Sequence, residues 1–228
     1  EYKRCVLHYV GVVLRTDVNV YAVIGRRVRR YNVKQLILFL DNVEQLSELG
    51  YDTMAMHPYP ASGWNRENVY EWFGFENTYF KSYFDKHPKK YGKIRGYYSD
   101  DATYRLIRET FRGKSDDSPL FIFDVTMQNH GGYTYKDSFK HTLPIDEIYA
   151  SGLARTGVTN TYLALIKKSD EALEKLVTFF EEETDDPTII LMFGDHQPAD
   201  WVVEPIYTMN GQTDSDQWSE SLERYTVP

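Results

Sequence analysis

Three histidine-bearing loops hold the side chains of this sequence that are best suited to chemistry. His57 begins the first loop, His130 lies in the second, and Asp195 and His196 lie in the third. Each loop follows a run of residues typical of a β-strand. In open α/β sheets, ligands bind beyond the carboxyl ends of the strands. We therefore expect the three loops to meet at one edge of a sheet.

The pair Asp195-His196 has the chemistry of a metal site. A carboxylate oxygen beside an imidazole nitrogen suits Mn²⁺, Zn²⁺ or Fe better than Ca²⁺ or Mg²⁺. Gly194 lets the backbone turn sharply enough for both neighbours to face one ion. The alternative is a turn in which Asp195 caps the backbone and His196 is solvated. On these residues alone both interpretations stay open.

The other two loops carry groups that could bind an anion. His130, which is followed by two glycines, could bind a substrate oxygen or donate a proton. Arg66 offers a fork of donors that matches phosphate or sulfate, and Trp64 could wall a pocket or stack on a substrate. The alternatives are a loop histidine bonded to the backbone and a packed surface loop. The repetition of three such loops favours a shared site.

The nucleophile is unknown. Metal-assisted phosphoryl or sulfuryl transfer needs a Ser, a Thr or an activated water. The residues around Cys5, the single cysteine, do not fit the Cys-x-Pro-x-Arg pattern of a formylglycine sulfatase. The sequence also has no Gly-x-Ser-x-Gly elbow, no P-loop and no Gly-x-Gly-x-x-Gly, which argues against an α/β-hydrolase triad and the common nucleotide sites.

Alternating strands and helices are predicted to position these loops. Strands are expected over residues 51–56, 120–127 and 188–193, and helices over 43–49, 67–73, 102–111 and 160–183. Residues 5–14 and 18–24 are Val-rich and could be strands, whereas the chain after Trp201 shows no strong period. Strands that alternate with long helices favour an α/β protein with a mainly parallel sheet.

Composition and charge narrow the class of protein. The 228 residues are 42% hydrophobic and 26% charged, which are globular values, and no apolar run approaches the roughly 20 residues of a membrane helix. Residues 1–42 hold eight Lys and Arg and three acidic residues, so their net charge is +5. Because the whole chain has a net charge of −8, residues 43–228 carry −13. The basic segment could indicate an anionic partner or only a solvated, irregular stretch. The acidic remainder argues against nucleic acid as a partner.

Six motifs in order resemble the lipoteichoic acid synthase / phosphoglycerol transferase family, in the sulfatase-like branch of the alkaline phosphatase superfamily. They are Ala55-Met56-His57-Pro58-Tyr59 with Gly63-Trp64-Asn65-Arg66 and Tyr70, then Gly74-Phe75, Ser99-Asp100-Asp101, Asn129-His130-Gly131-Gly132-Tyr133, Lys168-Ser169-Asp170-Glu171-Ala172-Leu173, and Phe193-Gly194-Asp195-His196-Gln197-Pro198. The resemblance covers about residues 43–205 and implies an alkaline-phosphatase-like α/β/α sandwich, incomplete in this chain.

The resemblance also implies roles for the residues. Asp195 and His196 correspond to two ligands of a catalytic Mn²⁺, with Mg²⁺ or Zn²⁺ as alternatives. His130 corresponds to the catalytic histidine that binds the substrate phosphate, and Trp64 and Arg66 to the pair that binds glycerol phosphate, with His57 near the site. The family transfers phosphoglycerol from phosphatidylglycerol through a covalent phospho-threonine.

The implied partners are a phospholipid head group or a phosphoglycerol polymer. Parent proteins of this family carry membrane helices before an extracellular catalytic domain, so the expected place is the extracellular face of a bacterial cell membrane. The alternatives are a phosphoethanolamine transferase, a phospho- or sulfo-ester hydrolase, or an anion-binding module that lacks a nucleophile.

The first part of the chain departs from the family. Residues 1–42 do not resemble the stretch that carries the family's remaining metal ligand, a Glu, and its nucleophilic Thr. We therefore expect a poorly matched basic segment, 1–42, before a partial catalytic domain, 43–228. A truncated, divergent or mistranslated start would explain the difference.

Overall fold

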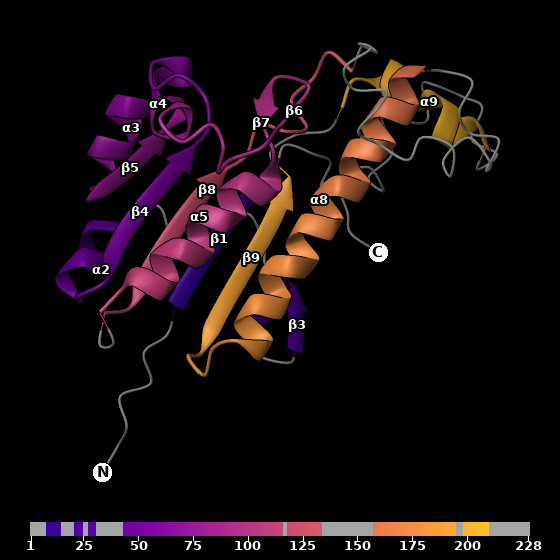
Figure 1. Ribbon diagram of the computed structural model, residues 1–228. Helices are drawn as coiled ribbons and strands as arrows, with labels where there is room; N and C mark the ends of the chain where they lie inside the picture. The colour runs from indigo at the N-terminus through magenta and orange to yellow at the C-terminus, as the bar shows by residue number, and fades with distance from the viewer. Residues whose placement is uncertain are drawn as a thin grey trace.

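The computed structural model describes residues 8–14, 21–24, 27–30, 43–115, 118–133, 157–194 and 198–209. Within them a seven-stranded sheet has the order β3-β2-β9-β1-β8-β4-β5 (Figure 1). The strands are β1 (His8–Leu14), β2 (Tyr21–Ile24), β3 (Arg27–Arg30), β4 (Asp52–His57), β5 (Asn77–Phe80), β8 (Leu120–Val125) and β9 (Thr188–Gly194). The five strands from β9 to β5 are parallel, whereas β2 and β3 are antiparallel to their neighbours. The predicted α/β fold with a mainly parallel sheet is confirmed.

Helices cover both faces of the sheet. They are α2 (Val43–Glu48), α3 (Arg66–Trp72), α4 (Lys81–Asp85), α5 (Asp100–Gly113), α8 (Gly157–Glu182) and α9 (Asp200–Met209), with a 3₁₀ turn, η1 (Gly63–Asn65), before α3. Figure 1 shows α5 and α8 lying across one face of the sheet. A small antiparallel hairpin of β6 (Lys93–Ile94) and β7 (Tyr97–Tyr98) stands before α5.

Strand β8 shows why the sheet lies between two helical layers. Every residue of β8 is buried, as expected of a strand covered on both faces. Leu120 and Ile122 pack with the helices α5 and α8, whereas Phe121 and Phe123 pack with α2 and α3. Burying one such side chain contributes about 1.5–3 kcal/mol, so the alternation holds both layers on the sheet.

The start of α5 differs in detail from its prediction. The helix was expected to begin at residue 102, but Asp100 and Asp101 are its first two residues and Ser99 is its N-cap. The Ser99 hydroxyl accepts a hydrogen bond from the backbone N–H of Ala102 at 3.2 Å. Asp100 is instead buried beneath the helix, where its carboxyl takes part in a polar network.

The chain after Trp201 shows no strong period in its sequence, yet helix α9 runs through this stretch. Val202 and Val203 are buried against Tyr162 and Leu165 of α8. Pro205 lies inside the helix and weakens the helical pattern in the sequence. Tertiary packing on α8 therefore stabilises a helix that local propensity does not reveal.

The segment of residues 1–42 supplies β1, β2 and β3, which lie in the same sheet as the later strands. The division into a segment 1–42 and a domain 43–228 stays a prediction. None of the helices in the described part of the chain is long and apolar enough to cross a membrane.

Candidate functional site

His57 is the last residue of β4 and is fully buried. Its Nδ1 lies 2.8 Å from the carbonyl oxygen of Val125, the last residue of β8. Because a carbonyl oxygen can only accept, Nδ1 carries the proton and donates it. This bond fixes the imidazole between two neighbouring strand ends, at the edge where ligands bind in parallel sheets.

Trp64 and Arg66 lie further along the loop that His57 begins. Trp64 and Asn65 both have left-handed backbones, with φ of 53° and 56°, and the Trp64 side chain is 50% exposed. The Arg66 guanidinium carbon lies 5.5 Å from the centre of the Trp64 ring, and Nη1 donates to the Tyr70 hydroxyl at 3.2 Å. A bulky residue with positive φ is a strained conformation of the kind that clusters at functional sites.

His130 lies in the loop after β8. Its ring centre is 6.0 Å from that of Trp64 and 5.6 Å from that of Tyr97. The Tyr97 hydroxyl is 3.4 Å from His130 Nδ1. Arg95 donates to the carbonyl oxygens of His130 and Gly131 at 3.3 and 3.2 Å. The hairpin β6–β7 therefore supports this loop from outside the sheet.

The rings of two of the histidine-bearing loops and of the hairpin form a closed circuit, which we call the aromatic circuit. It runs through His57, Tyr59, Tyr97, His130 and Trp64. Successive ring centres in that order lie 5.9, 6.5, 5.6, 6.0 and 5.8 Å apart, with the last distance returning to His57. The structure thus brings together four of the predicted site residues, since Arg66 stacks on Trp64.

The remaining two predicted site residues, Asp195 and His196, lie outside the described residues. Strand β9 ends at Gly194, directly before them, and it runs parallel to β1, which runs parallel to β8. Among the residues that the structure describes, no group of three or more His, Cys, Asp or Glu could hold a metal ion.

Sequence reasoning missed Arg95 and Tyr97 as members of this site. Arg95 and Gly96 both have positive φ, 56° and 87°, as in the type I′ turn of a tight hairpin. Ile94 before the turn and Tyr97-Tyr98 after it have high strand propensity. That pattern could have predicted the hairpin, but nothing local to it indicates contact with His130.

A buried polar network lies under the His130 loop and joins residues of three of the motifs. The Ser169 hydroxyl of α8 donates to Asp100 Oδ2 at 2.5 Å and accepts from Gln128 Nε2 at 3.0 Å and Asn129 Nδ2 at 2.7 Å. The backbone N–H of Asp100 donates to Gln128 Oε1 at 3.1 Å. Burial raises the pKa of the Asp100 carboxyl to about 6, against the hydrogen bonds from Ser169 and Thr126, which lower it. The network fixes the residues immediately before His130.

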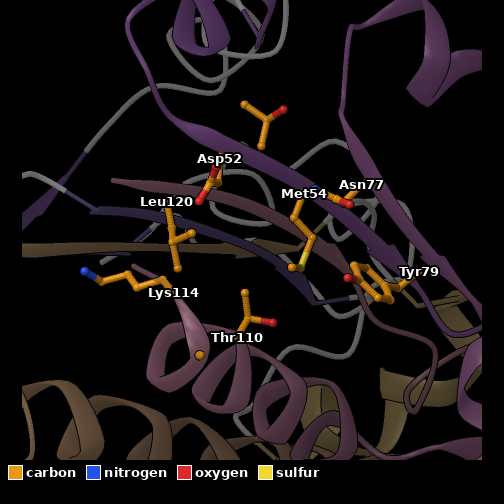
Figure 2. Close-up of a pocket in the computed structure, with 9 residues that line it drawn as sticks. Asp52, Met54, Asn77, Tyr79, Thr110, Lys114 and Leu120 are labelled. Atoms are coloured by element: carbon orange, nitrogen blue, oxygen red, sulfur yellow. The ribbon is translucent and has the colours of Figure 1, made fainter. Parts of the chain in front are cut away.

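A cavity of about 380 Å³ lies away from this site (Figure 2). It is lined by Asp52, Thr53, Met54, Asn77, Tyr79, Thr110, Gly113, Lys114 and Leu120. Figure 2 shows Met54 and Leu120 pointing from the sheet toward the helix that carries Thr110. Because β4, β5 and β8 begin at Asp52, Asn77 and Leu120, the cavity is at the amino ends of the strands, opposite the histidine loops.

Comparison with known proteins identifies the family. The family model "Sulfatase" matches residues 36–228. The chain is 32% identical over 163 residues to the protein named "Putative cyclic beta-1,2-glucan modification protein" of Rhizobium meliloti, which covers 71% of this chain and 24% of that protein. It is 24% identical over 152 residues to lipoteichoic acid synthase of Staphylococcus aureus, which covers 64% and 21%. The chain thus spans about a quarter of the length of these relatives.

Two solved structures share the fold. The phosphoglycerol transferase GacH of Streptococcus pyogenes, in complex with sn-glycerol-1-phosphate, has a TM-score of 0.56 at 14% identity, covering 96% of this chain and 65% of that one. The lipoteichoic acid synthase LtaP of Listeria monocytogenes has a TM-score of 0.52 at 19% identity, covering 77% and 39%. This chain therefore belongs to the Sulfatase family and is similar to the lipoteichoic acid synthases.

Proposed function

We propose that this chain is part of a metal-dependent transferase that moves phosphoglycerol from a phospholipid to a cell-surface polymer. The observation that carries the proposal is the convergence of Arg66, Trp64 and His130 at the carboxyl edge of the sheet. A guanidinium and an imidazole are donors suited to phosphate oxygens. The half-exposed ring of Trp64 lies between them and offers an apolar surface to the glycerol carbons.

In this proposal the cationic and aromatic groups have separate tasks. Arg66 and His130 bind the phosphoryl oxygens and stabilise the negative charge that develops on them during transfer. Trp64 holds the Arg66 guanidinium through a cation–π contact. His57 fixes the end of β4 against β8 through Val125 and packs on the edge of Trp64. The nucleophile remains unidentified.

The proposed metal ligands are Asp195 and His196, which would hold Mn²⁺, or alternatively Mg²⁺ or Zn²⁺. The site fits in two respects: β9 ends at Gly194 in the parallel set of strands, and the pair offers one oxygen and one nitrogen donor. When bound, such an ion polarises a phosphoryl oxygen.

The relatives support the choice of partners. GacH was solved with sn-glycerol-1-phosphate, and other relatives are named for a cyclic glucan, a capsular polysaccharide and lipoteichoic acid. A phospholipid head group as donor and a surface polymer as acceptor accord with these names. The proposed place is the extracellular face of a bacterial cell membrane.

The test is calorimetric binding of sn-glycerol 1-phosphate to the 228-residue chain in the presence of Mn²⁺. Because hydrogen bonds to charged groups contribute about 1.5–3 kcal/mol, Arg66→Gln should weaken binding at least tenfold. Arg105→Gln, at an exposed arginine of α5, is the matched control and should bind normally. Asp195→Ala should abolish Mn²⁺ binding.

The outcomes separate the proposal from its alternatives. Tighter binding of phosphoethanolamine or of a sulfate ester would favour a transferase or hydrolase of that specificity. Binding of glycerol phosphate without turnover of any phosphodiester would favour an anion-binding module. Equal binding by the native chain and Arg66→Gln would contradict the proposed site.

A further inference from the structure

The hairpin β6–β7 contacts His130 at both its backbone and its ring. We propose that this hairpin is the element that positions His130, with Arg95 fixing its backbone and Tyr97 orienting its imidazole. The proposal rests on the proposed role of His130 in binding the substrate phosphate. It makes Arg95 and Tyr97 positioning residues, which act on the substrate through His130.

Arg95 holds the loop by two hydrogen bonds. Its Nη1 and Nη2 donate to the carbonyl oxygens of His130 and Gly131 at 3.3 and 3.2 Å, and the guanidinium carbon lies 5.2 Å from the Tyr133 ring centre. The planar fork of an arginine reaches two successive carbonyls, which the single ammonium group of a lysine cannot do in the same geometry. The loop at His130 and just after it is therefore tied to the hairpin.

The turn of the hairpin brings the Arg95 side chain to this position. Arg95 has a left-handed backbone, with φ of 56°, and Gly96 follows with φ of 87°. Residues other than Gly, Asn or Asp take this conformation rarely, because it carries an energetic cost. The two hydrogen bonds to the His130 loop offset that cost, which accounts for an arginine at a position where Asn or Gly would be less strained.

Tyr97 contacts the imidazole ring of His130. Its hydroxyl oxygen lies 3.4 Å from His130 Nδ1, with the ring centres 5.6 Å apart. A hydroxyl both donates and accepts, so it can pair with Nδ1 whether the imidazole is neutral or charged. Nδ1 and Nε2 project in different directions from the imidazole ring, so a contact at Nδ1 also fixes the direction of Nε2. In the proposal, Tyr97 thus fixes the orientation of the His130 ring in both protonation states.

The hairpin is rigidly joined to the same loop at its other end. Strand β7 leads into Ser99, which caps α5, and the next residue, Asp100, donates its backbone N–H to the side chain of Gln128 at 3.1 Å. Gln128 stands two residues before His130. Two separate connections therefore hold the hairpin and the loop as one unit.

The experiment follows the side-chain nitrogens of His130 by NMR in the full chain labelled with ¹⁵N-histidine. The chain has six histidines, so His130→Gln assigns the signal. Tyr97→Phe, which removes only the hydroxyl, should shift the His130 Nδ1 resonance and its titration midpoint. It should also weaken binding of sn-glycerol 1-phosphate about three- to tenfold. Arg95→Lys should shift the same signals, since it keeps the charge and loses the fork.

Tyr83→Phe is the matched control, because Tyr83 lies beside another histidine, with its ring centre 5.2 Å from that of His87. It should leave the His130 signals and phosphate binding unchanged. His130 signals in Tyr97→Phe and Arg95→Lys that coincide with those of the native chain would overturn the proposal. If the native chain binds no glycerol phosphate, the proposed function fails, while these signals still decide whether the hairpin positions His130.

Discussion

At the scale of single residues, Trp64 combines backbone strain with exposure. Its φ of 53° lies in the left-handed region, and its indole is half exposed although it contacts His57, Tyr59 and His130. A left-handed backbone at a bulky residue costs about 1–3 kcal/mol and persists only where neighbours hold it. The aromatic circuit supplies those neighbours. The ring is thus kept at the edge of the sheet instead of being buried in the core.

Gly63 gives a direct test of this arrangement. A Cβ added at Gly63 would lie 2.8 Å from Tyr59 Cδ1, so Gly63→Ala must displace the Tyr59 ring and with it Trp64. We expect about 1–3 kcal/mol of destabilisation, as for an overpacked site, and loss of most glycerol phosphate affinity. Thermal unfolding and calorimetry measure the two effects. Gly113→Ala is the control, because nothing lies within 4 Å of its added Cβ. Unchanged affinity in Gly63→Ala would count against the circuit.

At the scale of elements, Ser169 of α8 joins α5 to the His130 loop. Its hydroxyl meets Asp100, Gln128 and Asn129 in a region closed to solvent. No apolar side chain could satisfy three polar partners there. Motifs that lie 40 to 69 residues from Ser169 in the chain therefore meet at one hydroxyl.

Ser169→Ala should destabilise the chain by about 2–4 kcal/mol, because it leaves a buried carboxyl and two amides without this partner. Urea unfolding measures the change. Ser115→Ala, at an exposed serine that pairs with Ser118 at 2.6 Å, should cost less than about 0.5 kcal/mol. If the two variants unfold at the same urea concentration, the network is not the support that we infer.

The elements also show which features of the fold and the site could be predicted from the sequence. The strand ends at His57 and Val125 follow from β-rich apolar runs, so the convergence of His57 and His130 at one edge could be predicted. Contacts made by Tyr97 and Arg95 could not, because they depend on a four-residue turn meeting a loop 35 residues later. Helix α9 could not be predicted for a similar reason, because Val202 and Val203 pack against apolar residues of α8.

At the scale of the whole molecule, buried carboxyls link stability to pH. Asp124 of β8 and Asp100 of α5 are both fully buried. Burial raises the pKa of Asp124 to about 8, the hydrogen bond with the Thr103 hydroxyl lowers it, and the negative charge of Asp100 raises it to a lesser degree. Burial likewise raises the pKa of Asp100 to about 6. The folded chain thus holds protons that an unfolded Asp, with a pKa near 3.9, has already released.

The direction in which stability changes with pH follows from this difference in pKa between the folded and unfolded states. Because the folded state binds more protons, these two carboxyls stabilise the chain most below about pH 4. Their contribution to the free energy of unfolding falls as the pH rises towards 8.

Asp124→Asn keeps the shape of the neutral acid and cannot ionise. We expect it to match the native chain near pH 4 and to exceed its stability at pH 8 by on the order of 2–4 kcal/mol. Urea unfolding between pH 4 and 8 measures both curves, with the exposed Asp52→Asn as control. Parallel curves for the native chain and Asp124→Asn would show that Asp124 does not carry the dependence, because a group that titrates alike in both states leaves the slope unchanged.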